Sequence, residues 1–278
     1  MSGHQGVWVY AIADHAGGDV FLPSGVAGTQ VRAISAAGLT VLASEVDLDE
    51  FGEAALRRNL ENLDWLEEAA RAHHGVVDTA ARVFPVLPAR FATVYSGAAT
   101  MVAALGERAG QLRAALARVG GHMEWGVKVY AIPAQAGDRP ARTRDGNPAG
   151  PIAVGAETAG AATGGGARAE PGAGMAYLRR RRAQISAHRE SSRTAVASAR
   201  EVHVELSGHA AQARLYPPQA PALSGIKAPM LLNAAYLLDA GGAAGFSSVV
   251  ASAAASHPDL RLDLTGPWPP YSFAGQGA

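Results

Sequence analysis

Two nearly identical hexapeptides lie far apart in the chain. Residues 7–12 are VWVYAI and residues 127–132 are VKVYAI, so the two differ only at Trp8 and Lys128. Both are rich in β-branched and aromatic residues, which favour strands on a half-buried surface. Each hexapeptide also opens a similar series of predicted elements. We therefore infer two related units, each beginning with one of these strands.

The first unit is predicted to follow the order strand, loop, strand, strand, helix, strand. Acidic residues after position 46 favour the start of the helix, and Gly75 is expected to end it, with another turn or two up to residue 82. The predicted elements are strands at 7–12, 31–35 and 39–45, a loop at 13–29, a helix at 50–73 and an edge segment at 83–95. The buried stripe of the helix consists of Leu56, Leu60, Leu63 and Ala70, and the edge segment contains Pro85 and Pro88. A second helix at 98–119 is expected to connect the two units.

The second unit is predicted to follow the order strand, helix, strand, strand, helix, strand. Its elements are strands at 127–132, 213–216, 230–238 and 260–264, and helices at 174–206 and 243–256. This is the ferredoxin-like order. The predicted fold class is α+β, with two ferredoxin-like domains whose antiparallel sheets carry helices on one face. We expect the N-terminal domain at residues 1–120 and the C-terminal domain at residues 121–278.

Residues 134–174 differ from the rest of the chain in composition. They hold ten of the 33 glycines and four prolines, and almost no large apolar side chains. Such a segment cannot bury enough surface to offset its conformational entropy. We predict a flexible insertion that is dispensable for folding. A second unusual segment, residues 266–278, is a tail rich in proline and aromatic residues.

Composition excludes several classes of function. The chain has 278 residues, no net charge and no cysteine, so it offers no thiolate chemistry and no bulk attraction to nucleic acid. It contains no long apolar window for a membrane span and no secretory signal, which predicts a cytoplasmic protein. The nine histidines form no recognised ligand pattern, and no nucleophile motif is present. We expect no metal, no cofactor and no enzymatic activity.

Three features are candidates for binding a partner, and each has a structural alternative. The basic run Arg179, Arg180, Arg181 and Arg182 is either a solvated helix face or a surface that binds acidic groups. The tail aromatics Trp268, Tyr271 and Phe273 either pack back on their domain or contact a partner. Trp65 lies opposite the apolar stripe of its helix, so it is either a core residue of a doubly buried helix or a contact residue.

A further group of residues lies where one predicted domain ends and the next begins. We assign these residues to architecture, because no nucleophile or metal-ligand set accompanies them; they are Pro88, Arg90, Phe91, Glu124, Trp125, Gly126 and Lys128. An enzyme with its site around Arg90, Glu124 and Lys128 is one alternative. A ligand- or RNA-binding regulator built on paired ferredoxin-like domains is another, although no aromatic RNA-binding signature is present.

Several motifs together resemble the gas vesicle protein F/L family. They are VWVYAI near the start, VLPARFATVY at 86–95, EWGVKVY at 124–130, the Tyr177-Leu178 pair before a basic helix, and TGPWPPYSF at 265–273. The order of the motifs agrees, and they cover both domains except residues 134–174. One departure is Ala92, where the pattern Arg-Phe-Gly-Thr would have glycine.

The resemblance implies an accessory protein of gas vesicle assembly. It implies a location at the gas vesicle, two ferredoxin-related α+β domains and no enzymatic activity. It also implies binding to the small hydrophobic gas vesicle shell protein, and to other gas vesicle accessory proteins. We expect the tail aromatics and the four arginines to form the contact to the shell protein.

Overall fold

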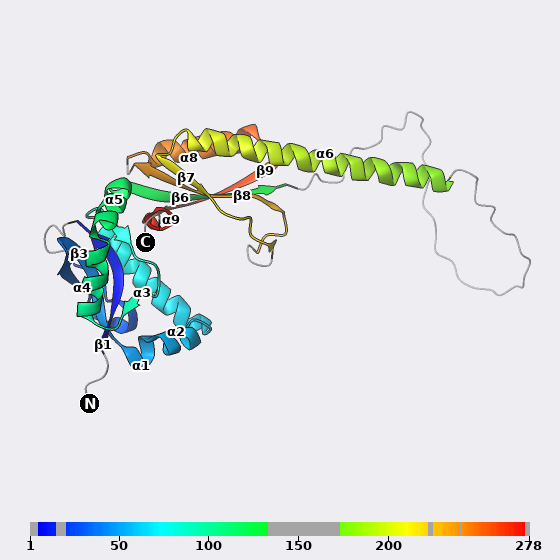
Figure 1. The fold of residues 1–278 in the computed structure, drawn as a ribbon. Coiled ribbons are helices and arrows are strands. Elements are labelled where there is room, and N and C mark those ends of the chain that lie inside the picture. The colour runs from blue at the N-terminus through cyan, green and yellow to red at the C-terminus, as the bar shows by residue number, and fades with distance from the viewer. Residues whose placement is uncertain (1–4, 15–20, 133–172, 222–224, 240, 276–278) are drawn as a thin grey trace, which may run out of the picture.

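The computed structural model describes residues 5–14, 21–132, 173–221, 225–239 and 241–275, and shows two α+β units built around separate antiparallel sheets (Figure 1). The insertion predicted at 134–174 lies outside the described residues, except for its last two positions. These belong to a helix. The boundary expected after residue 120 falls between the last helix of the first unit and the first strand of the second.

The N-terminal sheet contains β1 (Gln5–Ala13), β2 (Arg32–Ala36), β3 (Leu39–Asp47), β4 (Leu87–Pro88) and β5 (Val94–Tyr95). Its order is β2-β3-β1-β4, and β5 also pairs with β1. The first strand thus lies between the third and the fourth, as in a split β-α-β, ferredoxin-like unit. Only the short η1 (Val26–Gly28) is described between β1 and β2, which agrees with the loop predicted there.

The hairpin between β2 and β3 turns at Ala37 and Gly38. Both residues have left-handed backbones, with φ of 51° and 71°, and Ala36 pairs with Leu39 on either side of them. A two-residue turn with two positive φ angles matches the right-handed twist of its flanking strands. The strands predicted at 31–35 and 39–45 thus form a hairpin.

Helices cover both faces of the N-terminal sheet, whereas the sequence predicted them on one face only. On one face lie α1 (Leu48–Phe51), α2 (Glu53–Asn59) and α3 (Leu63–Ala81), and on the other lie α4 (Ala98–Glu107) and α5 (Ala109–Val119). Each face of the sheet has its own core, because successive side chains of β1 point to opposite faces. Trp8 and Tyr10 face α3, whereas Val7 and Val9 face α4 and α5. The segment at 98–119, which was expected to connect the two units, thus also covers one face of the first sheet.

The single helix predicted at 50–73 is wrong in two respects. It is divided into α1, α2 and α3, with Gly52 between the first two, and Asn62 begins α3 by accepting hydrogen bonds from the next turn. Gly75 does not end the helix, since α3 runs to Ala81. Because the chain changes direction before α3, Leu60 and Leu63 fall off the predicted buried stripe and are exposed, Leu63 by 76%.

The C-terminal sheet repeats the strand order of the first. Its strands β6 (His122–Ala131), β7 (Gln212–Leu215), β8 (Met230–Asp239) and β9 (Leu260–Trp268) are arranged β7-β8-β6-β9, all antiparallel. Helices α6 (Ala173–Ser207) and α8 (Ala243–Ser256) pack on one face, over residues such as Trp125 and Tyr236. Both helices and all four strands were predicted from periodicity.

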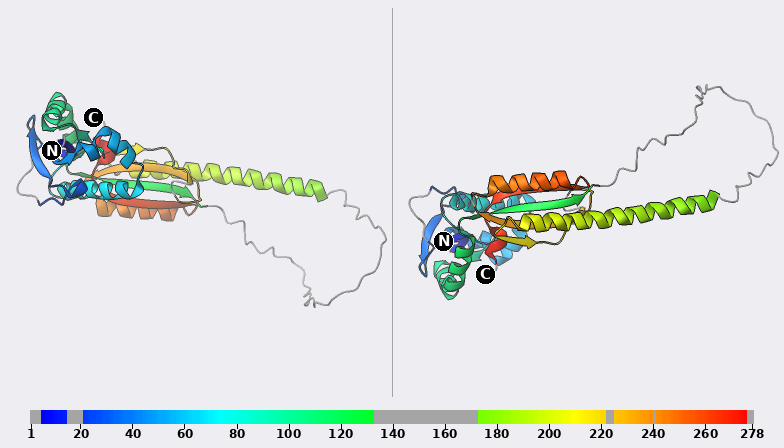
Figure 2. Two further views of the ribbon diagram at one scale, coloured as in Figure 1. Left: turned by 90° about the horizontal axis from the view of Figure 1, so that it is seen from below. Right: turned by 90° about the horizontal axis from the view of Figure 1, so that it is seen from above.

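Helix α6 is much longer than the sheet it packs on. Its second part carries Ala195, Ala199, Val202 and Leu206 into the core, whereas every described side chain from Met175 to Thr194 is exposed. Figures 1 and 2 show this first part extending well past the end of the sheet. We call residues 173–194 the arm.

The two units share one core. The cluster that contains Val9, Leu112 and Leu116 of the first unit also contains Leu237 of β8 and Phe273 of the last helix, α9 (Tyr271–Ala274). The end of the second unit therefore packs between its own sheet and the first unit.

Candidate functional site

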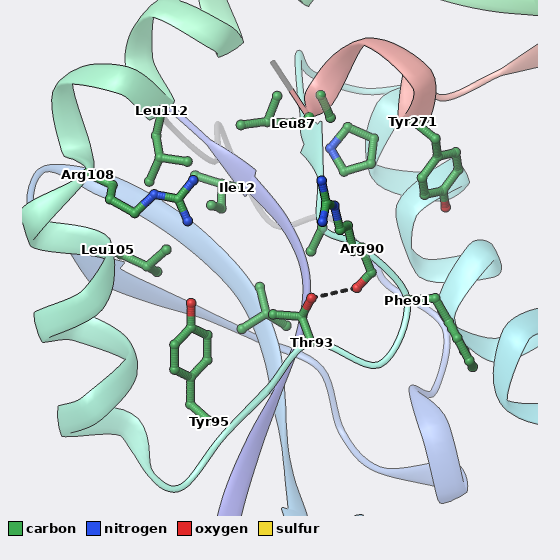
Figure 3. A pocket seen from close by; sticks show the side chains of 15 residues that line it. Ile12, Leu87, Arg90, Phe91, Thr93, Tyr95, Leu105, Arg108, Leu112 and Tyr271 are labelled. Carbon is green, nitrogen blue, oxygen red and sulfur yellow. Dashed lines mark hydrogen bonds between the residues drawn. The ribbon is translucent and has the colours of Figure 1, made fainter. Parts of the chain in front are cut away.

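A cavity of about 370 Å³ opens where α9 meets the N-terminal unit (Figure 3). Apolar side chains from β1, β4, α4 and α5 form much of its wall, and residues of the loop after β4 and of α9 complete it. The full lining is Val9, Ile12, Leu87, Pro88, Ala89, Arg90, Phe91, Thr93, Tyr95, Leu105, Arg108, Leu112, Tyr271, Ala274 and Gly275. A mostly apolar cavity with few polar groups is typical of a binding site.

The motif at 86–95 builds one side of this cavity. Pro88 is buried at the end of the two-residue strand β4, at the sheet edge, where its missing N–H costs no ladder hydrogen bond. Phe91 packs against Trp8 and His73, with ring centroids 5.4 and 5.7 Å away. The loop is thereby fixed to the core.

The same loop is closed by a tight turn. The hydroxyl of Thr93 donates to the carbonyl of Arg90 over 2.7 Å, and Ala92 has φ of 62°. That left-handed backbone explains why glycine suits this position better than alanine. The turn leaves Arg90 exposed at the mouth of the cavity.

Five polar side chains line the cavity: Arg90, Thr93, Tyr95, Arg108 and Tyr271. Figure 3 shows the guanidinium of Arg108 extending over the cavity from between α4 and α5, with Arg90 on the opposite wall and the Tyr95 hydroxyl below. Two arginines beside an apolar wall suit a partner that presents an acidic group next to apolar side chains. Apart from tyrosine and threonine hydroxyls, the lining offers no nucleophile, and it contains no carboxylate or histidine.

Glu124 is a structural residue at the start of β6. Its carboxylate accepts hydrogen bonds from the backbone N–H of Ser272 at 2.7 Å and from the Ser272 hydroxyl at 2.5 Å. Burial raises the pKa of Glu124, and the Ser272 hydrogen bonds and the charge of Arg214 oppose that rise. The same Arg214 donates to the carbonyl of Ser272 at 2.6 Å. Glu124 thus fastens α9 to the C-terminal sheet.

The site proposed for an enzyme around Arg90, Glu124 and Lys128 does not assemble. Lys128 donates to Gln219 at 3.1 Å, Glu124 binds Ser272, and Arg90 lines the cavity. The neighbouring motif residues pack: Trp125 is buried against Phe246, and a Cβ on Gly126 would lie 2.7 Å from the Thr265 hydroxyl.

The tail aromatics predicted as one contact surface have different environments. Phe273 is 2% exposed in the shared core, and Tyr271 lines the cavity with its hydroxyl 3.3 Å from His74 Nδ1. Trp268 is 42% exposed and its ring lies 5.4 Å from that of His74. Of the two alternatives for the tail, Phe273 and Tyr271 follow the first, since both pack back on the protein. Trp268 still offers a surface to a partner.

The other two candidates lie elsewhere. Trp65 is half-buried beside Phe51, with ring centroids 5.8 Å apart, so it packs on its own unit with one part open. Arg179 to Arg182 are all exposed near the free end of the arm, whereas Trp268 directly precedes α9 at the opposite end of the C-terminal unit (Figure 1). The arginines and Trp268 therefore cannot form one contact surface.

His73 shows why an isolated histidine here is a core residue. Its Nδ1 accepts from the indole N–H of Trp8 at 3.0 Å, and its Nε2 is buried without a partner in good hydrogen-bond geometry. Burial lowers the pKa of His73 to about 4, and the backbone of Ala89 opposes that shift. Within the described residues, no three His, Asp or Glu side chains gather as metal ligands, and no helix is long and apolar enough to cross a bilayer.

Sequence reasoning missed the far wall of the cavity. One continuous helix was predicted at 98–119, but Arg108 interrupts it with φ of −113° and separates α4, which carries Leu105, from α5, which carries Leu112. This break directs Arg108 over the cavity. The signal in the sequence is the charged pair Glu107-Arg108 between Gly106 and Gly110.

The fold places the chain among α+β proteins in which two units, each with its own antiparallel sheet, share a core. A family model described as "Gas vesicle synthesis protein GvpL/GvpF" matches residues 6–275, and the chain belongs to this family. It is 36% identical over 278 residues to "Gas vesicle protein L" of Streptomyces sp. (strain CB03234), covering 99% of this chain and 95% of that protein.

Two crystal structures have the same fold. One is the gas vesicle protein GvpF from Anabaena sp. PCC7120, with a TM-score of 0.63 and 20% identity over 99% of this chain and 98% of that one. The other is GvpF from Microcystis aeruginosa, with a TM-score of 0.61 and 18% identity over 97% and 98%. Both confirm the mixed helical and antiparallel fold predicted from the sequence.

Proposed function

We propose that this chain is a non-enzymatic accessory protein of gas vesicle assembly. It acts at the gas vesicle, in the cytoplasm, and binds the small hydrophobic shell protein before or during its incorporation; other accessory proteins are further partners. Membership of the gas vesicle family supports the process. The observation that supports a binding role is the apolar cavity at the junction of the two units.

The cavity has the chemistry that a hydrophobic partner requires. Its volume lies within the range of roughly 300–1,000 Å³ that ligand sites have. Leu87, Leu105 and Leu112 give the wall its apolar surface, and transfer of an apolar side chain into it removes that side chain from water. Arg90 and Arg108 then pair with an acidic group of the shell protein and fix its orientation.

Trp268 extends the same contact surface. It is the exposed member of an aromatic group in which His74 lies against both Trp268 and Tyr271, and Tyr271 lines the cavity. A large exposed ring beside an apolar cavity is the kind of residue on which binding energy concentrates. We therefore assign Arg90 and Trp268 to the shell-protein contact and Phe273 to the core.

The test is capture of the shell protein by an immobilised chain. The Arg90→Glu, Trp268→Ala variant should lose at least about tenfold in capture, since it removes one exposed aromatic and reverses one charge at the cavity. Both side chains are exposed, so thermal unfolding should stay close to that of the parent.

The matched control is Arg200→Glu with Phe21→Ala. It makes the same kinds of change at two exposed positions outside the cavity lining, Phe21 being 95% exposed. It should capture the shell protein like the parent. If the cavity variant stays folded and still binds like its control, the shell protein contacts another surface, and the role assigned to the cavity is wrong.

A further inference from the structure

The arm exposes more apolar surface than a helix in water needs. Met175, Tyr177, Leu178 and Ile185 are each about half exposed, from 45% to 60%. Leu178 and Ile185 are seven residues apart, two helical turns, and Met175 precedes Leu178 by three, so these side chains form a stripe along one side. An exposed stripe on a helix segment that no other part of the described chain covers indicates a contact with another molecule.

The charge of the arm is strongly one-sided. Between Met175 and Thr194 the sequence has six arginines, at 179–182, 189 and 193, and a single acid, Glu190. All six are exposed. Two arms would repel each other, so arm-to-arm pairing is disfavoured. Guanidinium groups beside an apolar stripe instead suit an acidic surface that has exposed apolar residues of its own.

The chain itself has such a surface, at the corner between α2 and α3. Leu60 and Leu63 are exposed there, by 38% and 76%, and Glu61, Asp64 and Glu68 lie beside them in sequence, also exposed. We call these five residues the acidic corner. None of the ion pairs described among residues 5–14, 21–132, 173–221, 225–239 and 241–275 uses its three acids.

The surroundings of the corner strengthen its negative charge. Residues 47–68 hold eight acids against two arginines, and all ten of these side chains are exposed. The whole chain is nevertheless neutral, with 24 basic and 24 acidic residues. Charge is thus separated between the arm of the second unit and the helices of the first, in a molecule with no net charge to oppose self-association.

A molecule cannot make this contact with its own arm. Figure 1 shows the free end of α6 pointing away from the N-terminal unit, and α2 lies well apart from it. A helical segment of the arm's length spans roughly 30 Å at about 1.5 Å per residue, enough to reach a neighbouring molecule.

We propose that the arm of one molecule binds the acidic corner of a second copy. The stripe of Met175, Leu178 and Ile185 packs on Leu60 and Leu63, and the arginines pair with the flanking acids. Because the two surfaces differ, the contact is head-to-tail. Repetition leads to open chains of molecules or to rings.

The proposal is independent of the shell-protein contact. It uses neither the cavity nor Trp268, and its test contains only this chain. A failure of either proposal therefore leaves the other standing.

The experiment is sedimentation of the full chain across a range of concentrations at low and high salt. We expect concentration-dependent association at about 50 mM salt that weakens roughly tenfold or more at about 500 mM, where surface charges are screened. A chain that remains monomeric at low salt up to about 100 μM would overturn the proposal, since a specific contact of micromolar Kd would be populated there. The arm would then serve another acidic partner.

Charge reversal tests which surfaces meet. The arm variant Arg179→Glu, Arg182→Glu and the corner variant Glu61→Arg, Asp64→Arg should each lose at least tenfold in self-association, because each creates like charges across the contact. In an equal mixture, the corner variant supplies an unchanged arm and the arm variant supplies an unchanged acidic corner. Association should therefore return as a pair of one molecule of each variant.

The control is Arg200→Glu with Lys227→Glu. It changes the net charge as the arm variant does, at exposed positions outside the arm and the corner, and should associate like the parent. Persistent association of the arm variant would refute the contact. So would a mixture that stays monomeric while both variants show the parent's unfolding temperature.

Discussion

Ala92 offers a sharp test of the loop that forms the cavity mouth. Its φ of 62° lies in the left-handed region, where an L-residue with a Cβ is disfavoured by roughly 1–2 kcal/mol. Glycine removes that penalty but loses about 0.5–1 kcal/mol through the greater freedom of its unfolded chain. Ala92 is also half-buried, so its methyl contributes a little packing.

The Ala92→Gly variant should therefore be more stable by about 0.5 kcal/mol, with an unfolding temperature higher by about 1–2 °C in a chain of this size. The assay is a paired comparison of urea midpoints and calorimetric unfolding temperatures. Ala103→Gly is the control, because Ala103 is exposed within α4 and glycine there should cost about 1 kcal/mol. A loss of stability at position 92 as large as that at 103 would show that Ala92 is not left-handed.

Two further predictions concern buried titratable groups. The pKa of His73 falls to about 4 in the folded state, from 6.5 when exposed. Between these pH values the unfolded chain therefore binds more protons than the folded chain. Up to roughly 3 kcal/mol of stability is lost as the pH falls through that window. His73→Gln keeps an acceptor for the indole of Trp8 and should flatten the fall in urea midpoint between about pH 6.5 and 4.5; an unchanged slope would assign the acid sensitivity to other groups. Glu124→Ala leaves the Ser272 N–H without its acceptor and should cost about 1–3 kcal/mol in urea unfolding, with Glu124→Gln between alanine and the parent. Equal midpoints for alanine and parent would contradict the role of Glu124 in holding α9.

The strands and the later helices of this fold could be predicted because each follows a single local period. Alternating residues in the two hexapeptides identify the first strand of each unit, and the structure places each of them inside its sheet, paired along both edges. Helix α8 begins and ends at the predicted residues, 243 and 256. In these elements one face is buried against the chain's own core, so periodicity and burial agree.

The helix predicted at 50–73 shows where that reasoning fails. Leu56, Leu60 and Leu63 have helical spacing, but Asn62 starts a new helix, and Leu60 and Leu63 on either side of this break are exposed. The arm shows the same failure in another form. Its apolar residues have the spacing of a buried face, yet no part of the described chain covers them. Periodicity reports that a face is apolar, and it cannot report what covers that face.

The candidate site was only partly predictable. Pro88, Arg90 and Phe91 were singled out from their motif, but as architectural residues and not as part of a cavity. Pro88 lies in a strand at the sheet edge, one of the positions expected for a proline. The cavity depends on segments brought together by the tertiary fold, including the α4–α5 break and the return of α9 to the first unit. No local pattern of residues encodes that meeting.

The burial of Phe273 links the order of synthesis to the order of folding. Its side chain packs in a core that contains Val7 and Val119, so the first unit lacks one of its packing residues until the last described helix leaves the ribosome. At about 5–20 residues per second, that delay is on the order of ten seconds. During this interval the nascent chain exposes an apolar surface that only its own later part covers. Products of termination before α9 therefore keep that surface exposed.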